Sequence, residues 1–122
     1  MEDKRKFSRI LFETKASLHN EQGEWQTRLH DLCLNGAMVE QPDGMQTDKP
    51  MELGFTLPGS DIELRMTADV VYQNNGFLGL KCAFIDLDSI THLRRLLELN
   101  TGDTSLLNRE LKQFITEHEQ AQ

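Results

Sequence analysis

The sequence predicts a mainly β fold, an antiparallel barrel or sandwich, followed by helices at the C-terminal end. Two patterns carry this prediction. Between residues 10 and 86, closely spaced segments alternate apolar and polar residues with a period of two, as half-buried antiparallel strands do. After residue 86, apolar residues recur three and four positions apart, as on amphipathic helices. A chain of 122 residues has the length of a single domain with one core.

The first strands are predicted at residues 10–19 and 25–34, joined across the polar turn "NEQGE". A short strand, "AMVE", follows Gly36 as a further candidate. The next strand begins at Met51, where apolar residues alternate as far as Leu57, and the turn "PGSD" closes it.

A β-hairpin gives the clearest signal, at residues 62–85. Its first strand, 62–72, alternates apolar residues at even positions, from Ile62 to Tyr72, with polar ones. The segment Asn74-Asn75-Gly76 supplies residues that tolerate positive φ in a tight turn. In the partner strand "FLGLKCAFI", the predicted apolar face consists of Leu78, Leu80, Cys82 and Phe84.

Two amphipathic helices are predicted after the last strand. Asp88 or Ser89 can cap the first helix, and Asp103 or Thr104 the second. The apolar stripe of the first contains Ile90, Leu93, Leu96 and Leu97, and that of the second Leu107, Leu111, Phe114 and Ile115. We expect both stripes to pack on the strands, although the second helix also has the form of a docking element.

Basic charge is concentrated at the N-terminus of an acidic chain. The formal net charge is −7, but the first ten residues carry +2 through Lys4, Arg5, Lys6 and Arg9, so the other 112 carry −9. A protein whose remaining residues are this acidic should not bind duplex DNA or anionic membranes over a broad surface. No apolar run approaches the roughly 18 residues of a membrane span, and the first residues are charged where a signal peptide is apolar. We therefore expect a cytoplasmic protein without membrane insertion.

The sequence offers little support for an enzyme or a metal protein. The two cysteines, Cys33 and Cys82, are predicted to be reduced thiols, and no CxxC or HExxH spacing indicates zinc. His30 and Asp31 superficially resemble a metal phosphohydrolase pair, but adjacent strand residues face opposite ways. No nucleophile and base are paired in the sequence, so we expect no catalytic site, no metal and no cofactor.

The segment "DLCLNG", Asp31 to Gly36, is the first candidate binding motif. In an extended chain Asp31 and Cys33 share one face, while His30 and Leu32 share the other. Gly36 permits a close backbone approach or an unusual turn. A carboxylate can accept from the N–H donors of guanine, and an arginine can donate to its O6 and N7. Alone, however, this segment is also compatible with an ordinary turn.

Together with an Arg-x-x-x-Arg motif at Arg5 and Arg9, the segment resembles the pattern RxxxR…[D/N]xSxxG of PilZ domains, which bind the bacterial second messenger cyclic di-GMP. The resemblance extends through "LGLKCAFID" and "LDSITHLRRLLELN", and is closest to the stand-alone subgroup. It implies one PilZ domain over residues 1–122. In that domain a flexible basic arm (1–9) precedes a six-stranded antiparallel β-barrel (10–86) and a helical C-terminal part (87–122).

The resemblance also implies a role for each motif residue. Arg5 and Arg9 would grip phosphate oxygens and guanine, Asp31 would accept from the guanine edge, and Gly36 would let the backbone approach the ligand. Further candidates for the nucleotide site are Lys4 and Lys6, which would add charge, and Tyr72, which could stack on a base or could simply be a core or rim residue.

Cys33 departs from the family pattern, which has serine at this position. A thiol is the weaker hydrogen-bond donor, so binding should be weakened and not abolished. Oxidation of Cys33 could also make binding redox-sensitive.

The implied function is a cyclic di-GMP receptor or adaptor that changes conformation as the arm closes and passes the signal to an unidentified effector protein. Residues 105–119 are the candidate element that shifts, and motility or biofilm formation is the process the family suggests. The alternative is a degenerate PilZ adaptor that binds a protein and no nucleotide.

Overall fold

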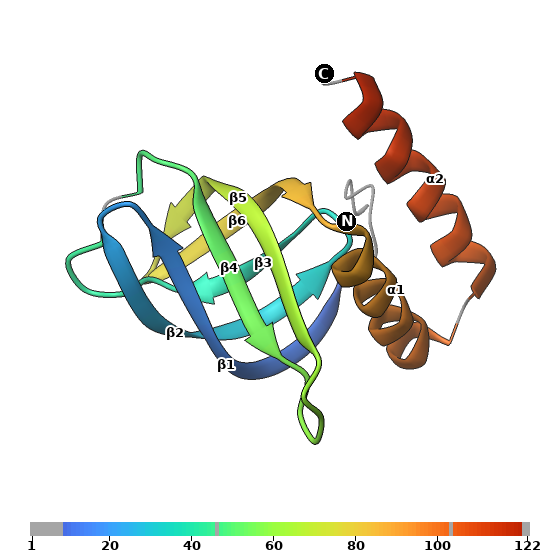
Figure 1. Cartoon of the computed structure of the whole chain (residues 1–122), viewed down its shortest axis with the longest axis horizontal. Coiled ribbons are helices and arrows are strands. Elements are labelled where there is room, and N and C mark those ends of the chain that lie inside the picture. The colour runs from blue at the N-terminus through green and yellow to red at the C-terminus, as the bar shows by residue number, and fades with distance from the viewer. Residues whose placement is uncertain (1–8, 46, 103, 121–122) are drawn as a thin grey trace.

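Six antiparallel strands close into a barrel, and two helices follow (Figure 1). This computed structural model describes residues 9–45, 47–102 and 104–120. The strands are β1 (Ile10–Asn20), β2 (Gly23–Cys33), β3 (Gly36–Glu40), β4 (Met51–Thr56), β5 (Glu63–Asn74) and β6 (Phe77–Ile85). The helices are α1 (Leu87–Thr101) and α2 (Thr104–Gln120). Around the barrel the order is β1-β2-β3-β6-β5-β4, which confirms the predicted six-stranded barrel with C-terminal helices.

The core fills the barrel and continues into α1. The inward side chains of the strands are apolar; those with no exposed surface include Leu18, Leu29, Leu32, Val39, Leu53 and Leu78. Helix α1 lies at one end of the barrel and contacts β5 and β1 (Figure 1). Its buried residues Leu93 and Leu97 join the barrel core, as the predicted stripe requires.

Phe84 does not lie on the predicted apolar face of β6. Its side chain is 65% exposed, whereas Leu78, Leu80 and Cys82 are buried. The cause is a β-bulge: Thr67 pairs with Phe84 but Ala68 pairs with Cys82, so β6 carries one extra residue at this step. A one-residue insertion moves the following side chains to the opposite face. Phe84 therefore points outward.

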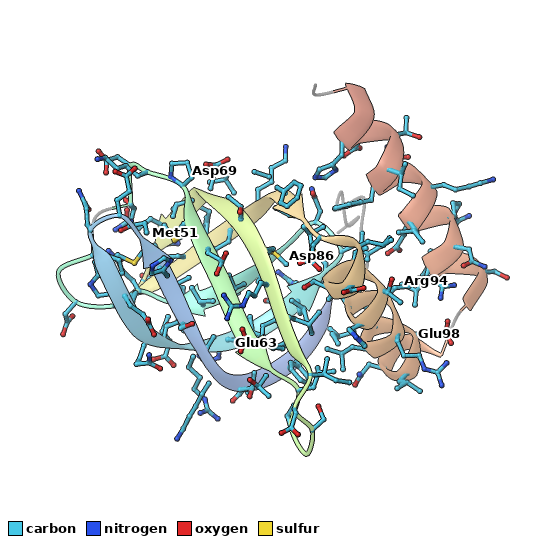
Figure 2. All side chains as sticks on the ribbon, viewed as in Figure 1. Met51, Glu63, Asp69, Asp86, Arg94 and Glu98 are labelled. Carbon is cyan, nitrogen blue, oxygen red and sulfur yellow. The ribbon has the colours of Figure 1, made fainter. Side chains whose placement is uncertain are left out.

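The N-cap of α1 is Asp86, and not Asp88 or Ser89 as predicted. Asp86 lies where the chain passes from β6 into α1 (Figure 2). Its carboxylate accepts a hydrogen bond of 2.9 Å from the Ser89 backbone N–H, which lowers the pKa of the carboxyl. The buried Ser89 hydroxyl accepts a bond of 3.1 Å from the Arg65 N–H, so the first turn of α1 is fixed to β5. The helix ends at Gly102, whose φ is 72°.

Helix α2 contacts α1, and the C-terminal part of α2 contacts β6. Leu107 and Phe114 are buried, but Ile115, predicted in the same stripe, is 46% exposed. The His118 ring stacks on Phe114 at a centroid distance of 3.9 Å, and its Nε2 lies 3.3 Å from the Cys82 carbonyl oxygen. Of the proposed N-caps, Thr104 is the first residue of α2, and Asp103 lies outside the described residues.

Candidate functional site

The barrel brings the described parts of the predicted motifs together in one open pocket. The pocket measures about 560 Å³ and lies over β2, β3, β6 and β5. Its lining consists of Arg9, Asp31, Cys33, Asn35, Gly36, Ala37, Met38, Val71, Tyr72, Gly79, Leu80 and Lys81. We call it the Asp31 pocket. Five of the predicted site residues are among these, while Lys4, Arg5 and Lys6 lie outside the described residues.

Strand register explains how residues distant in the sequence meet here. Asp31 pairs with Met38, Met38 with Gly79, and Gly79 with Tyr72, so one row crosses four strands. A neighbouring row begins at Cys33 and continues through Gly36 to Lys81. Residues in register on adjacent strands face the same side of the sheet. The two rows therefore form one surface.

Asp31 is a buried carboxylate paired with Arg9. Its side chain is only 6% exposed, and its Oδ2 lies 3.6 Å from Arg9 Nη1, whose side chain is 41% exposed. A buried carboxylate requires charged or hydrogen-bonding partners, and the Arg9 guanidinium supplies the opposite charge at 3.6 Å, which is beyond hydrogen-bond distance. The two residues form the polar end of the pocket.

A bulge in β2 separates Asp31 from its histidine neighbour. Leu29 pairs with Val39 but Asp31 pairs with Met38, which leaves His30 as the extra residue. The His30 ring packs edge-on against Phe77, and its Nε2 lies 2.7 Å from Glu40 Oε2. Leu32 is fully buried in the core, so the expectation that His30 and Leu32 share a face is wrong. His30 is not among the described residues that line the pocket.

Cys33 contributes a protonated thiol to the pocket. Burial raises its pKa, and the nearby Asp31 charge acts in the same direction. Burial raises the pKa of Cys82 to about 12. Both cysteines are free thiols, as predicted. A neutral thiol can donate only a weak hydrogen bond to a ligand.

Gly36 lets β3 approach β6 closely. A Cβ atom at Gly36 would lie 1.9 Å from the Leu80 carbonyl oxygen, which is far inside van der Waals contact. Just before it, the Asn35 carbonyl accepts a 2.8 Å hydrogen bond from the Cys82 N–H. The close approach that the sequence predicts is therefore made to the neighbouring strand β6. Any contact of Gly36 with a ligand would be additional.

Tyr72 lies at the rim of the pocket with its ring beside Gly79. The side chain is 49% exposed, and a Cβ at Gly79 would come within 3.0 Å of the Tyr72 Cδ1. A bulge between Val70 and Tyr72 leaves Val71, which is 64% exposed, on the same wall. Tyr72 is thus a rim residue, and its ring remains accessible for stacking.

Two polar groups of this pocket were not predicted. Asn35 Oδ1 is buried and has no hydrogen-bond partner within the described part of the chain. Lys81 is exposed and lines the pocket from β6. Asn35 could have been suspected, since it lies inside the motif. Lys81 depends on the pairing of β3 with β6, which no local pattern specifies.

The rest of the described surface gives less evidence of a binding site. A hollow of about 540 Å³ lies outside β1, β2, β4 and β5, where Arg65 is held by Glu52 and Glu63. Among the described residues, no cluster of histidine, cysteine or carboxylate side chains could hold a metal ion. No described helix is both long and apolar enough to span a membrane.

Comparison with known proteins agrees with the barrel fold. A sequence model of the PilZ domain matches residues 3–99. The crystal structure of the PilZ domain of CeSA from a cellulose-synthesizing bacterium is similar in fold, with a TM-score of 0.57 and 22% identity over 73% of this chain and 93% of that one. The Bacillus subtilis inhibitor of motility (MotI/DgrA) gives a TM-score of 0.63 and 20% identity over 79% of this chain and 53% of that one. This chain thus matches about half of the length of the motility inhibitor. The chain belongs to the PilZ domain family.

Proposed function

We propose that this protein is a cyclic di-GMP receptor or adaptor whose ligand binds in the Asp31 pocket. PilZ domains form a family of cyclic di-GMP receptors and adaptors, which are binding domains rather than enzymes. The observation that carries the proposal is the convergence of Arg9, Asp31 and Gly36 in one pocket that also has a tyrosine at its rim. No cofactor is part of the proposal.

The chemistry of the pocket suits a guanine base and its phosphate. Asp31 can accept from the N–H groups of the guanine Watson–Crick edge, and the Arg9 guanidinium can donate to O6, to N7 or to phosphate oxygens. The Tyr72 ring can stack on a base. We propose that Arg5, with Lys4 and Lys6, closes over the ligand from the arm.

Signal transfer is proposed to follow closure of the arm (1–9) over the barrel (10–86). The helical part (87–122) completes the single PilZ domain that we propose over residues 1–122. Helix α2 is the candidate for the element that shifts, because His118 lies against the Cys82 carbonyl while the Cys82 N–H donates to Asn35 in the pocket. Amide hydrogen exchange of residues 105–119 with and without nucleotide tests this part. Unchanged exchange would remove α2 from the proposal.

The partner is proposed to be an effector protein in the bacterial cytoplasm, and regulation of motility or biofilm formation is the proposed process. A second candidate function is a protein adaptor that no longer binds nucleotide. The observation that favours it is Cys33, whose neutral thiol replaces the hydroxyl of the family pattern.

Isothermal titration calorimetry with cyclic di-GMP at fixed moderate salt distinguishes the two functions. We expect saturable binding to the wild-type protein and its loss in Asp31→Ala. Arg28→Ala is the matched control, because Arg28 is exposed on the same strand and does not line the pocket. Cyclic di-AMP is the matched ligand control, since adenine lacks the guanine donors that Asp31 would bind. Absence of heat for the wild type at several temperatures would favour the protein adaptor.

A further inference from the structure

A second cationic group faces the Asp31 pocket from β6, whereas the arginine lies just before β1. Of the described residues that line this pocket, three are charged: Arg9, Asp31 and Lys81. Arg9 lies next to Asp31 at the β2 side, and its charge is already compensated by that carboxylate. Lys81 belongs to β6 and is in register with Gly36, which has no side chain to cover it.

The Lys81 ammonium has no ion pair within the described part of the chain. Asp69 lies opposite Lys81 in the β5–β6 register, but the two side chains form no salt bridge, and Asp69 does not line the pocket. A lysine in a protein with net charge −7 has many carboxylates available for pairing. An ammonium left unpaired at a pocket wall is free to receive an anionic ligand.

We propose that Lys81 is a ligand-binding residue that contacts a phosphate of the nucleotide from the β6 side. This inference rests on the proposed function and adds a residue that lies outside both sequence motifs. A cyclic dinucleotide carries two phosphates, and Lys81 supplies a cation for one of them in addition to the arginines of the RxxxR motif. Arg9 directly precedes β1 and Lys81 lies on β6, so the two cations hold the ligand from two sides. A lysine acts here as a point charge, without the planar fork of arginine.

The test compares three variants by calorimetry with cyclic di-GMP at low and high salt. K81Q removes the charge, K81R keeps it, and K15Q is the matched control, because Lys15 is an exposed strand lysine that lines the other hollow. We expect K81Q to weaken binding about tenfold at low salt. Raising the salt should reduce this difference, since screening weakens an exposed charge contact. K81R and K15Q should bind within about threefold of the wild type.

Two results overturn the role of Lys81. One is wild-type affinity in K81Q at low salt. The other is an equal, salt-independent loss in K81Q and K81R, which would indicate a packing role. In both cases the wild type still binds, so the proposed function survives. If the wild type does not bind cyclic di-GMP at all, the proposed function fails, and the role of Lys81 fails with it. Thermal unfolding of each variant verifies that the barrel is intact.

Discussion

Arg9 Nη1 lies 3.6 Å from the Asp31 Oδ2, and the arginine is far more exposed than the carboxylate that it approaches. The asymmetry matters for function. An exposed arginine can leave the pair for a phosphate, whereas the buried aspartate stays where it is. We therefore expect the pair to contribute more to ligand binding than to folding.

Arg9→Ala should separate these two contributions. Because the guanidinium is partly exposed and the buried Asp31 carboxylate has a further interaction, loss of this ion pair should cost no more than about 1 kcal/mol of stability. Loss of its hydrogen bonds to a charged phosphate should weaken cyclic di-GMP binding by about 10- to 100-fold. Chemical denaturation and calorimetry on the same preparation measure both. A large loss of stability with unchanged affinity would show that Arg9 is a structural residue.

Tyr72 should contribute through its ring and not through its hydroxyl. Tyr72→Ala is expected to weaken nucleotide binding, since stacking of a base on an aromatic side chain contributes about 1–3 kcal/mol. Tyr72→Phe keeps the ring and should bind within about twofold of the wild type. Calorimetry of both variants is the measurement. If Tyr72→Ala binds like the wild type, the tyrosine is only a rim residue.

Gly36 should be essential for the fold itself. In Gly36→Ala the new methyl group would meet the Leu80 carbonyl oxygen, a backbone atom that cannot move without disturbing β6. We expect the free energy of unfolding to fall by about 3 kcal/mol. Gly54→Ala is the control, because its nearest contact would be an ordinary 3.5 Å to the Ser17 side chain. That variant should stay within about 1 kcal/mol of the wild type. Urea denaturation tests both, and equal stabilities would contradict the close approach.

Much of the fold could be predicted because alternation and turn chemistry are local. The hairpin turn at Asn74-Asn75-Gly76 determines that Tyr72 faces Gly79, because a two-residue loop sets the register on both sides. The outward turn of Phe84 could not be predicted, since an inserted residue in β6 leaves the alternating pattern of the sequence almost unchanged.

The candidate site likewise contains some residues that a local sequence pattern can identify and one that it cannot. Asp31, Cys33 and Gly36 form a contiguous motif, so a pattern can identify them before the structure does. Lys81 reaches the same pocket only because β3 pairs with β6 across a closed barrel. Such pairing depends on contacts between distant segments, which no single stretch of sequence encodes. The binding roles of all these residues stay predictions.

Cys33 is expected to be unreactive, which argues against redox control of binding. Only the thiolate reacts rapidly with alkylating agents and peroxide, and burial raises the pKa of this thiol. The folded protein should therefore react slowly with iodoacetamide at neutral pH, and peroxide should leave nucleotide affinity unchanged. The unfolded protein serves as the fast-reacting control. Rapid modification of Cys33 in the folded state, with loss of binding, would restore the redox hypothesis.

The Asp86 cap should make the stability of the barrel–helix junction depend on pH. The Ser89 N–H bonds to the ionised carboxylate, so the pKa of Asp86 is lower in the folded protein than in the unfolded chain. The resulting stabilisation is present above the unfolded-state pKa of about 3.9 and is lost as the pH falls through the lower folded-state value.

Asp86→Ala should therefore reduce stability by roughly 1 kcal/mol at neutral pH and by less in acid. Asp86→Asn keeps a capping oxygen that does not titrate, so its stability should lack this component of the pH dependence. Urea denaturation between pH 7 and acid measures all three proteins; a deficit in Asp86→Ala that is constant with pH would mean that the carboxylate is not the cap.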